Sequence, residues 1–144
     1  MSFSSHDYAW AAGFLDGDGC FTLNRRRDKP GQNAEIHFGA VQVDRAPLDL
    51  LQQMFGGGVC RLGSTKKGTE IWQWRISASA DIRRVVPMLL PYLKLKKRDA
   101  EIVLAYAETV RRRGRIKAGG TGLTEHETML RLWLMSEMDF LRGR

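Results

Sequence analysis

The chain has 144 residues, enough for a hydrophobic core without disulfides, and residues 1–144 are expected to form one domain. There are 23 Lys and Arg against 16 Asp and Glu, a net charge of +7, which favours a polyanionic partner: nucleic acid or an acidic membrane surface. The two cysteines, Cys20 and Cys60, are too few for a disulfide scaffold and suit a reducing compartment. No signal peptide or membrane-spanning run is visible. We therefore expect an intracellular protein of a bacterial cytoplasm or an organelle, not secreted and without a membrane partner.

The first predicted helix begins after Ser4 or Ser5 and ends at residues 17–19. One of its faces is nearly bare of side chains, being formed by Ala9, Ala12, Gly13 and Gly17 with Asp16 beside them. The opposite face is the expected core stripe and carries Trp10, Ala11, Phe14 and Leu15. Glycine inside a helix costs roughly 0.5–1 kcal/mol relative to alanine, so two glycines on one face favour the close approach of a second helix.

Two carboxylates stand at the C-terminal end of this helix. That end already carries about half a negative charge, so Asp16 and Asp18 repel both the helix dipole and each other. A bound divalent cation would reverse the sign of these interactions. An ordinary buried helix ending in an Asp-Gly turn is the alternative interpretation of the same residues.

The chain then changes to a period of two, which predicts a strand. Phe21 and Leu23 point to the core, while Thr22, Asn24 and Arg26 form a polar front. A polar, turn-rich connection leads to a returning strand at residues 34–43. There Val41 and Val43 suit the core side and Gln42 the front, which places Ile36 and Phe38 on the front as well unless a bulge intervenes.

The remaining elements complete an α+β domain with two pairs of strands. We expect a helix at 46–55, strands at 59–62 and 70–76, helices at 81–90 and 96–111, a basic Gly-rich link at 111–122, and a last helix from the capping box at Thr124 to about residue 141. In the strand at 70–76, aromatic backing alternates with a front of Ile71, Gln73 and Arg75. No internal repeat and no second copy of the acidic motif occur.

Residues 11–19, AAGFLDGDG, resemble the signature of the LAGLIDADG homing endonucleases, and they keep Gly13, Asp16, Asp18 and Gly19. The segment from Pro91 into the following helix is similar to the one that carries a catalytic lysine in single-motif members, and Lys96 matches that lysine. The resemblance implies an αββαββα core, here at about residues 6–110, with a four-stranded antiparallel saddle sheet, and leaves a C-terminal helical extension at about 123–142. It also implies a homodimer in which the signature helices pack through the bare face.

The function implied is site-specific hydrolysis of double-stranded DNA on a long pseudo-palindromic site. Phosphodiester hydrolysis needs an in-line water, a neutralised phosphate and help for the leaving oxygen, which divalent metals between carboxylates provide. The resemblance makes Asp18 the metal ligand, with Asp16 as runner-up and the Gly17 carbonyl as a possible addition, and gives Lys96 the task of stabilising phosphate charge. Arg45 stands where the family often has a water-ordering glutamine. Mg²⁺ is the expected cofactor, Mn²⁺ the expected substitute, and Ca²⁺ should bind without efficient cleavage.

Reading of bases in the major groove is expected from the strand fronts, because Arg suits guanine and Asn or Gln suits adenine. The expected readers are Thr22, Asn24, Arg26, Gln42, Arg61, Gln73 and Arg75. Phosphate contacts are expected from the basic turns at 25–29, at Lys66 and Lys67, and at 111–115.

Two other classes of function stay open on the sequence alone. The first is a non-cleaving nucleic-acid-binding protein on the same fold, either an intron RNA maturase or a transcription regulator. The second is a basic α+β interaction protein whose acidic motif is incidental. The presence of Asp16, Asp18 and Lys96 together favours the endonuclease.

Overall fold

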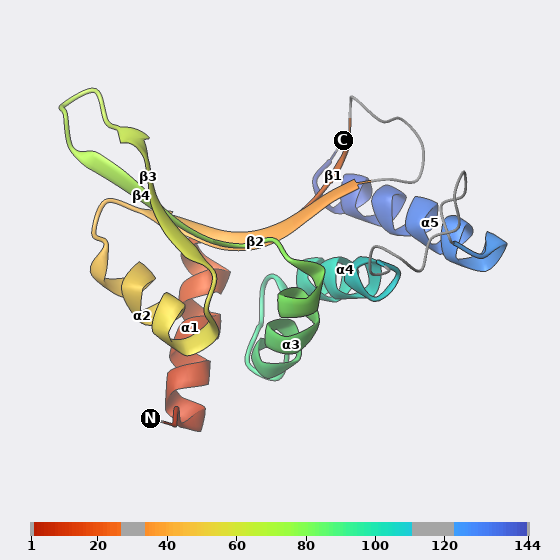
Figure 1. Ribbon diagram of the computed structural model, residues 1–144, viewed down its shortest axis with the longest axis horizontal. Helices are drawn as coiled ribbons and strands as arrows, with labels where there is room; N and C mark the ends of the chain where they lie inside the picture. The colour runs from red at the N-terminus through yellow and green to blue at the C-terminus, as the bar shows by residue number, and fades with distance from the viewer. Residues whose placement is uncertain (1, 27–33, 111–122, 144) are drawn as a thin grey trace.

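A computed structural model describes residues 2–26, 34–110 and 123–143. A curved antiparallel sheet has helices on one face, while its opposite face carries none of the described helices (Figure 1). The elements in chain order are α1 (Ser5–Asp18), β1 (Gly19–Arg25), β2 (Ala34–Gln42), α2 (Ala46–Phe55), β3 (Gly58–Ser64), β4 (Glu70–Ile76), α3 (Ser79–Leu89), α4 (Lys97–Glu108) and α5 (Glu125–Leu141). The four strands are ordered β1-β2-β4-β3, so the αββαββα order is confirmed, with α4 and α5 following it. We call the helix-free side of the sheet the open face.

The orientation of β2 differs from the expectation. The buried apolar side chains of this strand are Ile36, Phe38 and Ala40, whereas Val41 is 40% exposed and Val43, just after the strand, is 54% exposed. β2 pairs with β1 and β4 without a shift in register, and the one irregularity among the described strands lies in β3, between Arg61 and Gly63. No bulge in β2 is needed to resolve the conflict, because the even-numbered residues face the helices along the whole strand.

Aromatic rings join the sheet to the helices that cover it. Phe21 of β1 stacks on Phe38 of β2 with ring centroids 5.1 Å apart, and Phe38 meets the edge of Trp74 at 5.6 Å. Phe55 at the end of α2 lies 6.3 Å from Trp74, whose indole N–H donates to the carbonyl of Gly56 at 2.8 Å. Burying these large side chains is the main source of stability for the sheet–helix contact.

α1 contacts α3 and the strands β1 and β2, and it buries a different stripe from the one expected. Ala11, Ala12 and Leu15 are buried, but Trp10 is 39% exposed and stacks on half-buried Phe14, with centroids 5.5 Å apart. Ser4 is the N-cap, and it exchanges hydrogen bonds with Asp7 in a capping box. Trp10 therefore borders the bare face and is not part of the core.

α5 packs beside α4 and the edge strand β1, at the far end of the sheet (Figure 1). Arg25 pairs with Asp139 at 3.2 Å and Arg98 with Glu137 at 3.3 Å. Arg131 is 7% exposed, donates to Thr109 and lies over the ring of Tyr106. None of the helices in the described ranges is long and apolar enough to cross a membrane.

Candidate active site and nucleic-acid interface

The two acidic residues at the end of α1 have different surroundings. Asp16 accepts three backbone N–H groups of the segment before α4: Lys94 at 2.7 Å, Leu95 at 3.2 Å and Lys96 at 3.0 Å. Burial by itself would raise the pKa of Asp16, but the three backbone hydrogen bonds and the Lys96 charge outweigh it and hold the pKa below its ordinary value. Both oxygens of Asp16 are thus occupied in joining α1 to α4, which favours a structural role over metal binding.

Asp18, by contrast, is exposed and has one oxygen available. Its Oδ2 accepts the side-chain amide of Gln42 at 2.8 Å, and within the described part of the chain no group donates to Oδ1. Gly17 lies in the last turn of α1, where the backbone carbonyls have no hydrogen-bond donor within the helix. Gly19, which follows Asp18, is buried because its backbone approaches α1 closely: a Cβ there would lie 2.7 Å from the Leu15 carbonyl oxygen.

Asp18 Oδ1 and the Gly17 carbonyl oxygen are the ligand atoms available here, and oxygen ligands suit a hard divalent cation. Among the described residues no group of three or more His, Cys, Asp and Glu is placed to hold a metal. Magnesium is commonly bound by one or two carboxylates together with substrate phosphates, so a single exposed carboxylate still fits it. A zinc site, which needs a closed set of nitrogen or sulfur ligands, does not fit these residues.

Lys96 lies beside the acidic residues, at the C-terminus of α1. Its ammonium group donates to the carbonyls of Leu15 at 3.1 Å and of Gly19 at 2.5 Å. A positive charge at this end of a helix offsets the dipole. The structure therefore brings Lys96 and the signature together, as the sequence predicts, from positions about 80 residues apart.

Arg45 does not contact the acidic residues in the described structure. Its guanidinium pairs with Asp49 at 3.0 Å and lies over the ring of Trp72, 4.6 Å from the centroid. The side chain that reaches Asp18 is Gln42. A water-ordering role for Arg45 stays a prediction, and the observed contacts give it a packing role where β2 ends and β4 begins.

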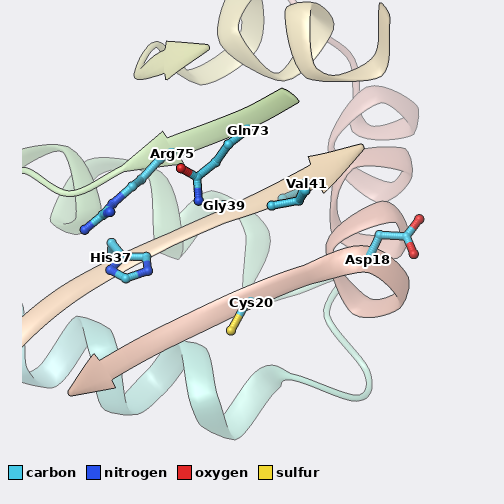
Figure 2. Close-up of a pocket in the computed structure, with 8 residues that line it drawn as sticks. Asp18, Cys20, His37, Gly39, Val41, Gln73 and Arg75 are labelled. Atoms are coloured by element: carbon cyan, nitrogen blue, oxygen red, sulfur yellow. The ribbon is translucent and has the colours of Figure 1, made fainter. Parts of the chain in front are cut away.

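The open face carries a shallow hollow of about 90 Å³, which Figure 2 shows from close by. Asp18 lies at one end, and Arg75 and His37 lie together at the other. The hollow is lined by Asp18, Cys20, His37, Gly39, Ala40, Val41, Gln73 and Arg75. Pockets for small organic ligands usually have about 300–1,000 Å³, so this surface suits a contact with a larger partner better than an enclosed substrate.

Arg75 and its neighbours are the charged part of this face. Arg75 pairs with Glu35 of β2 at 2.6 Å, and both side chains are more than one-third exposed. Burial and the Arg75 charge lower the pKa of half-buried His37, and within the described structure its Nδ1 has no hydrogen-bond partner. Sequence reasoning missed Glu35 and His37, although the odd-numbered pattern of β2 would have identified them had its orientation been assigned correctly.

The expected base-reading residues divide between the two faces. Gln73 and Arg75 line the open face, and Thr22 is paired with His37 across β1 and β2, although Thr22 is only 5% exposed. Asn24 continues the alternation of Thr22 and is paired with Glu35. Arg26 follows β1 and is exposed.

Two members of the expected set need correction. Gln42 and Arg61 are both register partners of Trp72, so they share the helix-side face, opposite Gln73. Arg61 pairs there with Glu70 at 3.4 Å. The reversed orientation of β2 explains Gln42, and the alternation of β4 explains Arg61.

The expected phosphate contacts are only partly described. Lys66 and Lys67 are exposed in the turn between β3 and β4. In the turn at 25–29, Arg25 is engaged by Asp139 of α5, and residues 27–29 lie outside the described ranges, as do residues 111–115.

The expected dimer surface is also divided. Ala9, Gly13 and Gly17 are exposed, and a Cβ added at Gly13 or Gly17 would meet nothing within 4 Å. Ala12 must be corrected, because it is fully buried in its own chain. Asp16 is held by the segment before α4, so its carboxylate is not free for a second copy.

Comparison with known proteins gives consistent results. A family model described as LAGLIDADG endonuclease matches residues 11–105. The DNA endonuclease I-CvuI of Chlorella vulgaris is 28% identical over an aligned length of 102 residues. The match covers 67% of this chain and 61% of that relative, so it spans about three-fifths of the relative's length.

Solved structures of I-CvuI resemble the fold. One, in complex with its target in the presence of 2 mM Ca, has a TM-score of 0.69 at 22% identity and covers 96% of this chain and 85% of that one. Another, with the I-CreI target in 2 mM Mg and the DNA not cleaved, has a TM-score of 0.58 at 26% identity over 74% and 70% of the two chains. The family match covers well over half of the chain and includes the acidic motif, both strand pairs and most of α4. The chain therefore belongs to the LAGLIDADG endonuclease family.

Proposed function

We propose that this chain is a site-specific DNA endonuclease that hydrolyses phosphodiester bonds in double-stranded DNA with a divalent metal ion. The observation that carries the proposal is the exposed Asp18 carboxylate, which stands at one end of the open face with Oδ1 available. A protein that only binds DNA gains nothing from a carboxylate there, because it repels phosphates unless a cation is bound. The family membership supports the same conclusion.

The open face is the proposed DNA surface. Gln73 and Arg75 would read base edges in the major groove, and Lys66 and Lys67 would contact phosphates. A net charge of +7 provides the attraction to a polyanion. I-CvuI, a relative of this chain, is seen in complex with its DNA target, which supports the assignment.

Asp18 and the Gly17 carbonyl would hold the metal. Mg²⁺ bound there would neutralise phosphate charge and activate water. The ammonium group of Lys96, held against the end of α1, would stabilise the negative charge that develops on the phosphate. We expect Mn²⁺ to substitute for Mg²⁺, and Ca²⁺ to support DNA binding without efficient cleavage.

The active form is proposed to be a homodimer on a long pseudo-palindromic site. One chain supplies one acidic motif, and cleavage of both strands needs two. The exposed Gly13 and Gly17 on α1 allow a second α1 to approach closely, with Trp10 at the border of the contact. Two copies related by a two-fold axis would present their open faces to successive half-sites.

The proposal is tested by Asp18→Asn in a paired gel-shift and cleavage series on the cognate site, in Mg²⁺ and in Ca²⁺. Cleavage should be lost while DNA binding is kept or tightened, because the change removes both metal affinity and the repulsion of phosphates. Lys96→Met should lower the cleavage rate more than the affinity, because the charge is needed mostly as the transition state forms.

Lys94→Met is the matched control for Lys96→Met, because Lys94 is an exposed lysine of the same segment whose backbone, not its ammonium group, bonds to Asp16. Near-native cleavage by Asp18→Asn would rule out Asp18 as the metal ligand of the reaction. DNA binding by the native protein without cleavage at any Mg²⁺ concentration would instead leave a DNA-binding protein on this fold, the class that includes intron maturases and transcription regulators.

A further inference from the structure

Gln42 contacts the proposed metal ligand directly. It is the last residue of β2, lies on the helix-side face, and its Nε2 donates to Asp18 Oδ2 at 2.8 Å. A side chain on that face is turned away from the surface that Gln73 and Arg75 line. The position of Gln42 therefore suits an action on the carboxylate better than the reading of a base.

We propose that Gln42 is a positioning residue for Asp18, which holds Oδ2 and leaves Oδ1 directed to the metal and the phosphate. This inference rests on the proposed function, because it concerns the same metal site. Nothing else in the described structure donates to the Asp18 carboxylate. Asp16, two residues earlier, shows the contrasting case, because donors occupy both of its oxygens.

The physical need for such a residue follows from the location of Asp18. Asp18 stands at a helix C-terminus, where the dipole repels its charge, and it is exposed, so that its side chain has more than one accessible rotamer. A donor on one oxygen offsets part of the repulsion and selects one orientation. Carboxylates that bind metals are commonly hydrogen-bonded in this way, and loss of the partner typically costs about 10–100-fold in metal affinity or activity.

The end of β2 is itself held in place. Gln42 is paired with Trp72 of β4, and the guanidinium of Arg45 covers the Trp72 ring at 4.6 Å from its centroid. Arg45 is in turn held by Asp49 of α2. This packing fixes the backbone from which Gln42 reaches Asp18.

The test uses Gln42→Met, which keeps the length of the side chain and removes the donor. Gln53→Met on the exposed side of α2 is the control, and Gln73→Met on the open face is the comparison for base reading. Two titrations are measured for each variant. In the first, the affinity for the cognate DNA is measured as the Ca²⁺ concentration is raised; in the second, the cleavage rate is measured as the Mg²⁺ concentration is raised.

For Gln42→Met, both half-maximal metal concentrations should rise about 10–100-fold with the base preference unchanged. Gln73→Met should change the base preference and leave the metal concentrations as they are, and Gln53→Met should change neither. In an Asp18→Asn background, Gln42→Met should have no further effect on the Ca²⁺ titration, because the group through which it acts is gone.

An altered base preference with unchanged metal titrations would overturn the inference and make Gln42 a base reader. An equal effect of Gln42→Met with and without Asp18 would also overturn it, since the residue would then act through the fold alone. If the native protein binds DNA but cleaves it at no Mg²⁺ concentration, the proposed function fails, while the Ca²⁺ titration still decides the role of Gln42.

Discussion

Asp16 and Asp18 are separated by one glycine, yet they meet different neighbours. The partners of Asp16 are backbone groups 78 to 80 residues further along the chain, and the partner of Asp18 is Gln42 at the end of β2. The sequence identifies the pair, and only the resemblance to the family makes Asp18 the preferred metal ligand. It could not separate their roles, because the separation depends on contacts between distant segments that no local pattern encodes.

Replacement of Asp16 by Asn should destabilise the fold by about 1–3 kcal/mol at neutral pH, because one of the two oxygens that accept backbone N–H groups is lost together with the charge. The pKa of Asp16 is lowered in the folded state, so its carboxylate stabilises the fold above the unfolded pKa of about 3.9, and this contribution is lost as the pH falls through the folded pKa. Urea unfolding of both proteins between pH 7 and pH 2 should therefore show a difference that is constant at high pH and shrinks in acid.

Asp49→Asn is the matched control for this series. Asp49 takes part in an exposed i,i+4 pair with Arg45, so its replacement should cost no more than about 0.5 kcal/mol. A difference between native and Asp16→Asn proteins that stayed the same down to pH 2 would show that the ionised carboxylate is not what stabilises the segment before α4.

At the scale of elements, the bounds of helices and strands were easier to predict than their faces. The helix at 46–55 and the strand at 70–76 were predicted with the bounds observed for α2 and β4, because Pro47 and Gly56 mark the former and the alternation of aromatic and polar residues marks the latter. In β2 both sets of alternate residues contain apolar side chains, so its sequence allows either face to be buried. Pairing of Phe38 with Phe21 and Ile76 decides the orientation, and those contacts are long-range.

The exposed face of α1 leads to a prediction about assembly. Gly13→Leu should keep the fold, because a Cβ at Gly13 meets nothing within 4 Å in the chain and leucine favours a helix over glycine by nearly 1 kcal/mol. The same change should prevent two α1 helices from packing closely, so light scattering should give a dimer for the native protein and a monomer for Gly13→Leu, with an equal or higher thermal midpoint for the isolated chain.

Two comparisons make the assembly result specific. Gln53→Leu, on the exposed side of α2, should stay dimeric. Ala12→Leu should instead lower the thermal midpoint, because Ala12 is fully buried and extra methylene groups in a packed core are destabilising. A native protein that is monomeric in solution and fully active would contradict the assignment of α1 as the dimer contact.

Over the whole molecule, charge is distributed unevenly between the open face and α5. α5 carries Glu125, Glu127, Glu137 and Asp139, and it lies at the far end of the sheet beside β1 (Figure 1). The open face carries Arg75 together with Glu35 and Asp18, and the turn beyond β3 carries the exposed Lys66 and Lys67. DNA is therefore expected to extend along the open face toward this basic turn and away from the outer surface of α5.

Substitutions on the open face and in the turn should weaken DNA binding in two distinguishable ways. Arg75→Met should relax the preference at one or two base pairs in each half-site, at a cost of about 1–3 kcal/mol for a lost bidentate contact. Part of that cost is offset by the ion pair of Arg75 with Glu35 at 2.6 Å, which must open before the guanidinium binds a base.

Lys66→Met should weaken binding to all DNA sequences alike, and it should reduce the slope of log affinity against log salt concentration by about 0.9 for each phosphate contact removed. The measurement is a set of binding isotherms on the cognate site and on single-base variants at several salt concentrations. Equal losses on every base from Arg75→Met, or an unchanged salt slope for Lys66→Met, would count against the open face as the DNA surface.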